Sequence, residues 1–133
     1  MRVRQVIGVS FFMMAGIVQA QAQSDNGFPF GLEMTLEGPS QPGSKRRPTL
    51  DIGDSGETRL ELWCKGGDGQ FSVANDTVIF VAGAMDERSC PPDRAAADDQ
   101  LLSALTEATN WKRQGDLISF TGPKTLRFRL NTN

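Results

Sequence analysis

The sequence contains no histidine, and this absence excludes a large part of enzyme chemistry. Ser-His-Asp and Cys-His catalytic constellations and histidine-based metal sites are not open to this chain. Carboxylate chemistry remains, but the acids of Asp86-Glu87 and Asp98-Asp99 are neighbours in sequence, which tends to point their side chains apart. We therefore expect no catalytic residues, no metal site and no cofactor, and we expect that the protein is not an enzyme.

Cysteine is also scarce, because Cys64 and Cys90 are the whole content of the chain. One pairing is possible, and it would close a loop of 26 residues (90 − 64). In the chain-entropy model such a loop stabilises a fold by roughly 3–4 kcal/mol. The spacing is not Cys-x-x-Cys, and two thiols fall short of the four ligands of a closed zinc site. A structural disulfide is the prediction, with free or reactive thiols and a metal site as the alternatives.

Long apolar runs are missing except near the N-terminus, where residues 6–18 follow the basic Arg2 and Arg4. This run of about 13 residues is shorter than the roughly 20 that cross a bilayer. Small residues at Ala20 and Ala22 offer cleavage sites. The pattern predicts a cleaved signal peptide over residues 1–22, with a membrane anchor as the alternative. A periplasmic or secreted protein is expected, with no membrane span after cleavage, in a compartment where disulfides persist.

The remaining chain is acidic. Of 14 basic and 16 acidic residues, Arg2 and Arg4 leave with the signal peptide, so 12 remain against 16, a net charge near −4. The basic triplet Lys45-Arg46-Arg47 is expected to be a solvated loop, and nucleic acid is not an expected partner. About 110 residues suffice for one domain and one core. We expect a leader over residues 23–31 and a single domain over 32–133, present as a monomer.

Short β-like runs alternate with turn residues along this domain. In residues 58–62 apolar and charged side chains alternate with period two, which indicates a strand with one buried face. In contrast, the continuous apolar run of residues 78–81 predicts a strand buried on both faces. Strands are predicted at 32–37, 49–52, 57–63, 70–74, 77–81, 110–114, 117–121 and 125–130.

One segment, Asp93 to Thr109, is predicted to be helical, with Asp93 as its N-cap after two prolines. Its apolar residues form one stripe: Ala97, Leu101, Ala104, Leu105 and Ala108. The helix dipole explains the acids Asp93, Asp98 and Asp99 near its start, so these are interpreted as structural or solvated. The pattern predicts an α+β fold, with about seven to eight short strands in a curled antiparallel β-sheet or partial barrel packed on one amphipathic helix.

The order of these elements resembles the META domain family, the HslJ-like heat-shock proteins, over about residues 47–130. The elements that carry the resemblance are Leu62-Trp63-Cys64, a hairpin with Phe71 and Ile79, Arg88-Ser89-Cys90-Pro91, Leu101 to Leu105, the Trp111 strand, Gly115-Asp116-Leu117 and Leu126-Arg127-Phe128. Cys64 stands between Trp63 and Lys65, where the family has glycine and asparagine. Asp98 or Asp99 stands where the family usually has a helix glutamate.

The resemblance implies a small envelope or secreted domain without established catalytic activity, linked to heat shock, antibiotic tolerance and secretion. It favours a periplasmic accessory or stress-response protein, either a protein-interaction module or a chaperone-like one, with an envelope protein as a possible partner. Trp63, Trp111 and Lys65 form the candidate interaction surface, although the more common role of such tryptophans is in the core. The alternatives are an inhibitor of a hydrolase such as lysozyme and a small-ligand-binding barrel.

Overall fold

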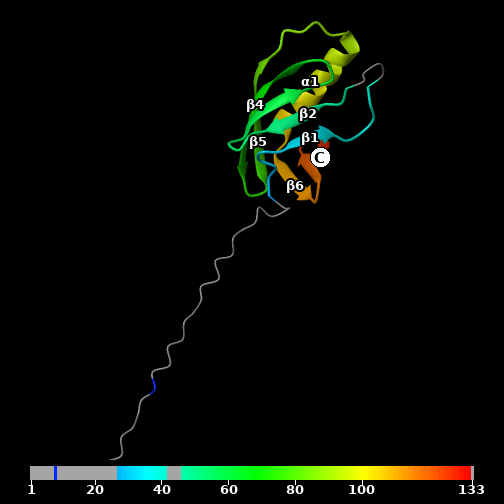
Figure 1. Ribbon diagram of the computed structural model, residues 1–133. Helices are drawn as coiled ribbons and strands as arrows, with labels where there is room; N and C mark the ends of the chain where they lie inside the picture. The colour runs from blue at the N-terminus through cyan, green and yellow to red at the C-terminus, as the bar shows by residue number, and fades with distance from the viewer. Residues whose placement is uncertain (1–7, 9–26, 42–45, 133) are drawn as a thin grey trace, which may run out of the picture.

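The computed structural model of the protein describes residues 8, 27–41 and 46–132 (Figure 1). The predicted signal peptide, apart from Gly8, lies outside these residues, as does the predicted leader up to residue 26. The described part of the chain forms eight strands and one helix, in the order β1(Glu33–Leu36), β2(Thr49–Ile52), β3(Glu57–Glu61), β4(Gly66–Ala74), β5(Thr77–Met85), α1(Pro92–Glu107), β6(Asn110–Gln114), β7(Leu117–Thr121) and β8(Thr125–Leu130). Among the described residues, no helix has the length and apolar character that crossing a membrane requires.

Each strand pairs antiparallel with the next, and β1 pairs with β8, so the sheet closes into a barrel. The ring is uneven, because β5 and β6 are joined by the single residue pair Thr77–Asn110. The neighbouring strands β4 and β5 pair over almost their whole length. The predicted α+β fold with a curled antiparallel sheet is therefore confirmed.

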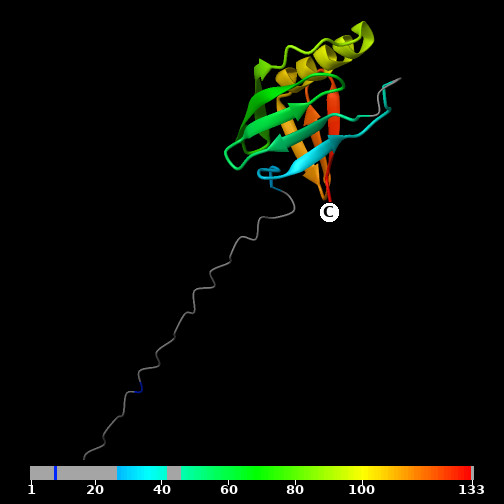
Figure 2. The ribbon, with the colours of Figure 1, turned by 45° about the horizontal axis from the view of Figure 1, so that its top comes forward.

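Helix α1 connects β5 to β6 and lies across one end of the barrel (Figure 2). Leu101 and Leu105 lie in the hydrophobic core, as the predicted apolar stripe requires. The predicted start at Asp93 is one residue late, since α1 begins at Pro92, and the predicted cap is wrong. Pro91 takes the N-cap position with no side-chain cap, and a proline in the first turn lacks only an N–H that would have no helical partner.

The opposite end of the barrel is covered by residues 27–31, so the prediction that they are part of a leader is wrong (Figures 1 and 2). The ring of Phe28 lies 5.2 Å from that of Trp111 and 5.5 Å from that of Phe71, centroid to centroid. Pro29 is fully buried, and Arg113 donates a hydrogen bond to the Gly27 carbonyl. These residues belong to the folded domain because their apolar side chains complete its core.

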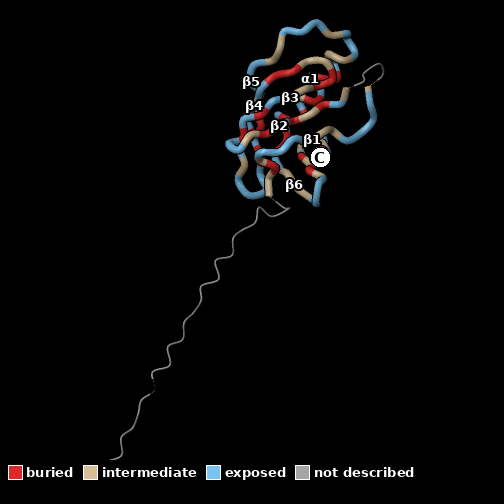
Figure 3. Tube along the Cα trace, in the orientation of Figure 1, coloured by how far each residue is buried: buried red, intermediate tan, exposed pale blue. Residues whose placement is uncertain are grey.

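Buried and exposed positions alternate along the strands, as Figure 3 shows for the barrel wall. The prediction that residues 78–81 are buried on both faces is wrong. Val78 and Phe80 are each 3% exposed, whereas Ile79 is 62% and Val81 59% exposed. A barrel wall has one inner face, so only alternate residues of β5 reach the core.

Strand β4 begins at Gly66, four residues before the predicted start at Gln70. Its first half is rich in glycine and therefore shows no alternation of apolar and polar side chains that would predict a strand. The inner wall has no space for side chains at these positions. A Cβ on Gly69 would lie 2.3 Å from Cζ of Phe80, and one on Gly67 would lie 2.2 Å from the sulfur of Met85. The large side chains of β5 therefore fill the volume that β4 leaves empty.

Candidate functional site

The predicted site residues Trp63, Cys64 and Lys65 all lie in the β3–β4 loop, residues 62–65, and α1 holds this loop through one carboxylate. Asp98 is 2% exposed. Its Oδ1 accepts the N–H of Trp63 at 2.7 Å, and its Oδ2 accepts the N–H of Lys65 at 2.8 Å. The N–H of Cys64 lies 3.2 Å from both oxygens. One buried side chain therefore satisfies the backbone donors of the loop.

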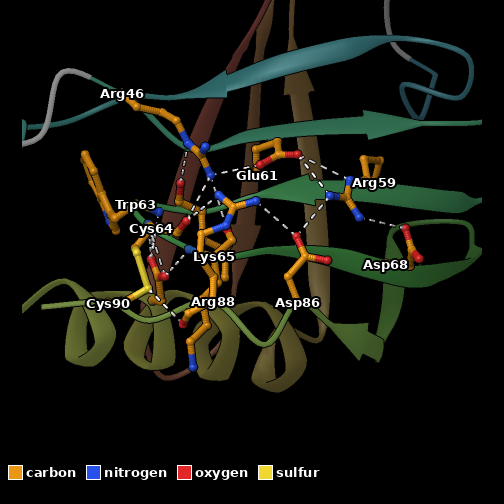
Figure 4. Close-up of polar contacts among 12 residues, drawn as sticks. Arg46, Arg59, Glu61, Trp63, Cys64, Lys65, Asp68, Asp86, Arg88 and Cys90 are labelled. Carbon is orange, nitrogen blue, oxygen red and sulfur yellow. Dashed lines mark hydrogen bonds and ion pairs between the residues drawn. A yellow bond between two sulfur atoms is a disulfide. The ribbon is translucent and has the colours of Figure 1, made fainter. Parts of the chain in front are cut away.

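The β3–β4 loop is also held by arginines and by a disulfide, as Figure 4 shows. The guanidinium of Arg46 donates to the Leu62 carbonyl at 3.0 Å, and that of Arg88 donates to the Cys64 carbonyl at 2.9 Å. Cys64 is bonded to Cys90, consistent with the predicted disulfide. The N–H groups of Trp63, Cys64 and Lys65 thus point to α1, and the carbonyls of Leu62 and Cys64 to the arginines. The Leu62 N–H donates to the Lys65 carbonyl and closes the loop on itself, so these contacts together hold the loop in one conformation.

Beside this loop, acidic and basic side chains of β3, of β4 and of the segment after β5 form a continuous ion-pair network (Figure 4). Arg59 contacts Glu61 at 3.2 Å and Asp86 at 3.3 Å, and Asp86 also contacts Arg88 at 3.3 Å. The hydrogen bond to Glu61 raises the pKa of Arg59 above its ordinary value, so this guanidinium stays charged. Each carboxylate faces a guanidinium, an arrangement that neutralises charge at a half-exposed surface.

The acids that are neighbours in sequence, Asp98-Asp99 and Asp86-Glu87, do not form carboxylate pairs. Asp98 is buried on the loop, while its neighbour Asp99 is exposed, so the two acids face different surroundings. Asp86 is bound by two guanidinium groups, and Glu87 is exposed. Among the described residues, no group of three or more histidine, cysteine, aspartate or glutamate side chains could hold a metal ion.

The residues of the predicted interaction surface are not brought together as a binding face. Trp63 is 6% exposed and belongs to the core, which removes it from any surface role. Trp111 is half-buried at the other end of the barrel, where its indole N–H donates to the Asn75 carbonyl at 2.7 Å. Lys65 is half-buried and is the last residue of the β3–β4 loop. Trp63 is excluded from the predicted interaction surface because the β3–β4 loop, which carries it, is anchored on α1.

Asp98 is the residue that sequence reasoning missed. The helix dipole was a sufficient explanation for an acid near the start of α1, and it concealed the buried position. A signal was present, because Asp98 precedes Leu101 by three residues and Leu105 by seven, and therefore lies on the apolar face of the helix. An acid at a core position requires hydrogen-bond donors, and the nearby loop supplies them.

The outer face of β4 and β5 carries exposed apolar side chains instead of the tryptophans. Ile79 is paired across the strands with Ser72, and Val81 with Gln70. Both apolar side chains point away from the core and lie two residues apart on one strand. We call these four residues the β4–β5 patch. It contains no charged residue. The ion-pair network, in contrast, begins at Asp68, two residues before Gln70 on β4.

An eight-stranded antiparallel barrel closed at its ends by one helix and an aromatic segment defines the class of fold. Within that class, a family model described as the META domain matches residues 30–132. The chain belongs to the META domain family. The resemblance read from the sequence is thereby confirmed, and it extends beyond residue 47 to include β1 and part of the aromatic segment.

One solved structure, described as an NMR structure, is similar to this chain with a TM-score of 0.60 and 19% sequence identity. The likeness covers 75% of this chain and 89% of the other. At this identity the likeness is one of fold alone. No curated protein matches the chain.

Proposed function

We propose that this META domain is a non-catalytic accessory or stress-response protein of the bacterial periplasm that binds a partner protein through the β4–β5 patch. The barrel is suited to presenting a surface rather than to enclosing a ligand. Its inner positions are filled by large side chains, among them Phe120, Phe128 and Met34, each with no exposed surface. Residues 27–31 cover one end of this interior, and α1 lies across the other.

The observation that carries the proposal is the exposure of Ile79 and Val81. Each exposes about three fifths of its surface (62% and 59%) although burying such a side chain is worth about 1.5–3 kcal/mol. The inner residues of β5 supply the core, so most of the apolar surface of these two side chains stays in contact with water in the monomer. Exposed apolar residues that lie on the same face of one strand are typical of a protein contact. The small size of the patch favours a weak, transient contact.

The partner that fits this surface has an uncharged apolar area of its own. The β4–β5 patch offers two β-branched side chains with Ser72 and Gln70 beside them, and no charge that would select an acidic or basic target. A folded envelope protein with a small apolar patch meets these requirements. An unfolded client would meet them as well, which is the chaperone-like form of the same proposal.

The test is a capture experiment with three forms of the oxidised mature protein on a column: wild type, the double variant Ile79→Ser/Val81→Ser, and the control Leu32→Ser. Leu32 is also apolar and exposed (41%), but it lies just before β1. An envelope extract is passed over each column. We expect a partner that wild type and Leu32→Ser retain in stoichiometric amount and that the double variant loses.

Equal capture by all three forms, or capture by none, would contradict the proposed surface. If the retained protein is lysozyme or another hydrolase whose activity falls on binding, the protein is an inhibitor rather than an accessory factor. If no protein is retained but tryptophan fluorescence responds saturably to a small molecule, the ligand-binding barrel replaces the proposal.

A further inference from the structure

The three-stranded sheet β6–β7–β8 has an outer face that differs in charge from the rest of the protein. Strand register places Lys112, Ser119 and Arg127 in one row across the three strands. The next row holds Gln114, Leu117 and Arg129. On these three strands neither row holds an acidic side chain. We call these six residues the basic face. Glu37, just after β1, borders the face, and its N–H donates to the Arg127 carbonyl at 2.8 Å.

The charge of this face opposes that of the whole chain. Residues 108–132 hold five basic residues (Lys112, Arg113, Lys124, Arg127 and Arg129) and one acid, Asp116. The chain over residues 46–107 holds six basic and twelve acidic residues. The protein is therefore polarised, with a basic sheet on a domain that is otherwise acidic.

Within the described part of the chain, two of the three cations of the basic face form no ion pair with an acidic side chain, in contrast to the arginines of the ion-pair network. Among the described residues, neither Lys112 nor Arg127 forms an ion pair. Arg129 pairs with Glu37 at the edge of the face. The backbones of Lys112 and Arg127 are two strand spacings apart, about 10 Å, with the Ser119 hydroxyl between them.

We propose that the basic face binds an anionic glycan, a carboxylated or sulfated polysaccharide. An extended polymer with recurring anionic groups can pair with Lys112 and Arg127 together, and sugar hydroxyls match Ser119 and Gln114. The face has no exposed large apolar side chain, since Leu117 is half-buried, so it has nothing to insert into a membrane. This site lies on other strands than the β4–β5 patch and does not depend on the proposed protein partner.

The experiment measures binding to heparin and to polygalacturonate in low salt. It compares wild type with Lys112→Gln/Arg127→Gln and with a control, Lys65→Gln/Arg94→Gln, that removes the same charge near α1. Both double variants remove two exposed or half-exposed cations, and thermal unfolding verifies that each is folded. We expect the basic-face variant to bind at least about tenfold more weakly than the control, and wild-type binding to fall steeply with salt because the contacts are charged.

Three results would overturn the proposal: no binding of wild type to either polymer, equal binding by both double variants, or stronger retention by phosphatidylglycerol vesicles or duplex DNA than by either glycan. The third result would assign the face to a membrane surface or to nucleic acid. None of these results alters the capture experiment, because Ile79 and Val81 are unchanged in every variant.

Discussion

Replacing Asp98 by asparagine is expected to destabilise the protein strongly, although the two residues are nearly equal in size. The carboxylate accepts the N–H groups of Trp63, Cys64 and Lys65, and both of its oxygens are used. An asparagine keeps one oxygen and turns an NH₂ group toward a backbone N–H. Hydrogen bonds to a charged group contribute about 1.5–3 kcal/mol each, and a buried donor without a partner costs about 1–3 kcal/mol. We expect a loss of about 2–4 kcal/mol.

The assay is urea unfolding of the oxidised protein followed by tryptophan fluorescence, with Asp99→Asn as the matched control. Asp99 is the next residue of α1 and is exposed, so its replacement is expected to change the free energy of unfolding by less than about 0.5 kcal/mol. For a domain of this size, the loss at Asp98 corresponds to a fall in Tm of roughly 10–30 °C. If Asp98→Asn is as stable as Asp99→Asn, the hydrogen bonds from the β3–β4 loop to Asp98 contribute nothing to stability and the reasoning fails.

Three further predictions concern the disulfide, the helix and the aromatic segment. Cys64→Ser and Cys90→Ser should lower stability by similar amounts, roughly 3–4 kcal/mol, and the double variant should be no worse; additive losses in urea unfolding would mean that the bridge is wrong. Leu105→Asp places a carboxylate at a fully buried position, so circular dichroism should show an unfolded chain, and a folded spectrum would refute the packing of α1. Phe28→Ala removes ring contacts with Phe71 and Trp111 and should lower the free energy of unfolding in urea by about 2–4 kcal/mol. An unchanged midpoint would mean that Phe28 is part of a leader and not of the core.

The elements that sequence predicted best are those with a clear period. Strands at 49–52, 110–114, 117–121 and 125–130 have the predicted bounds, because alternation and turn residues define them locally. The start of β4 and the start of the folded domain were predicted wrongly for a different reason. The inner glycines of β4 carry no period, and only the bulk of Phe80 and Met85 across the barrel explains them. The role of Phe28 likewise depends on partners more than 40 residues away in sequence.

Side-chain environment was harder to predict than the fold. The apolar run of residues 78–81 has one exposed face because a closed barrel leaves nothing to cover its outer side. The burial of Trp63 and Asp98 arises from one contact between the β3–β4 loop and α1, elements separated by 35 residues. A sequence pattern reports the period of a segment, and it does not report which distant segment covers it.

The most direct test of the proposed function is site-specific photo-crosslinking in living cells. A photoreactive amino acid is placed at position 79, on the β4–β5 patch, and in a second strain at position 100, on the exposed side of α1. We predict a discrete adduct with one envelope protein from position 79 and none from position 100. No adduct at position 79, or the same adducts from both positions, would contradict the claim that this face binds a partner.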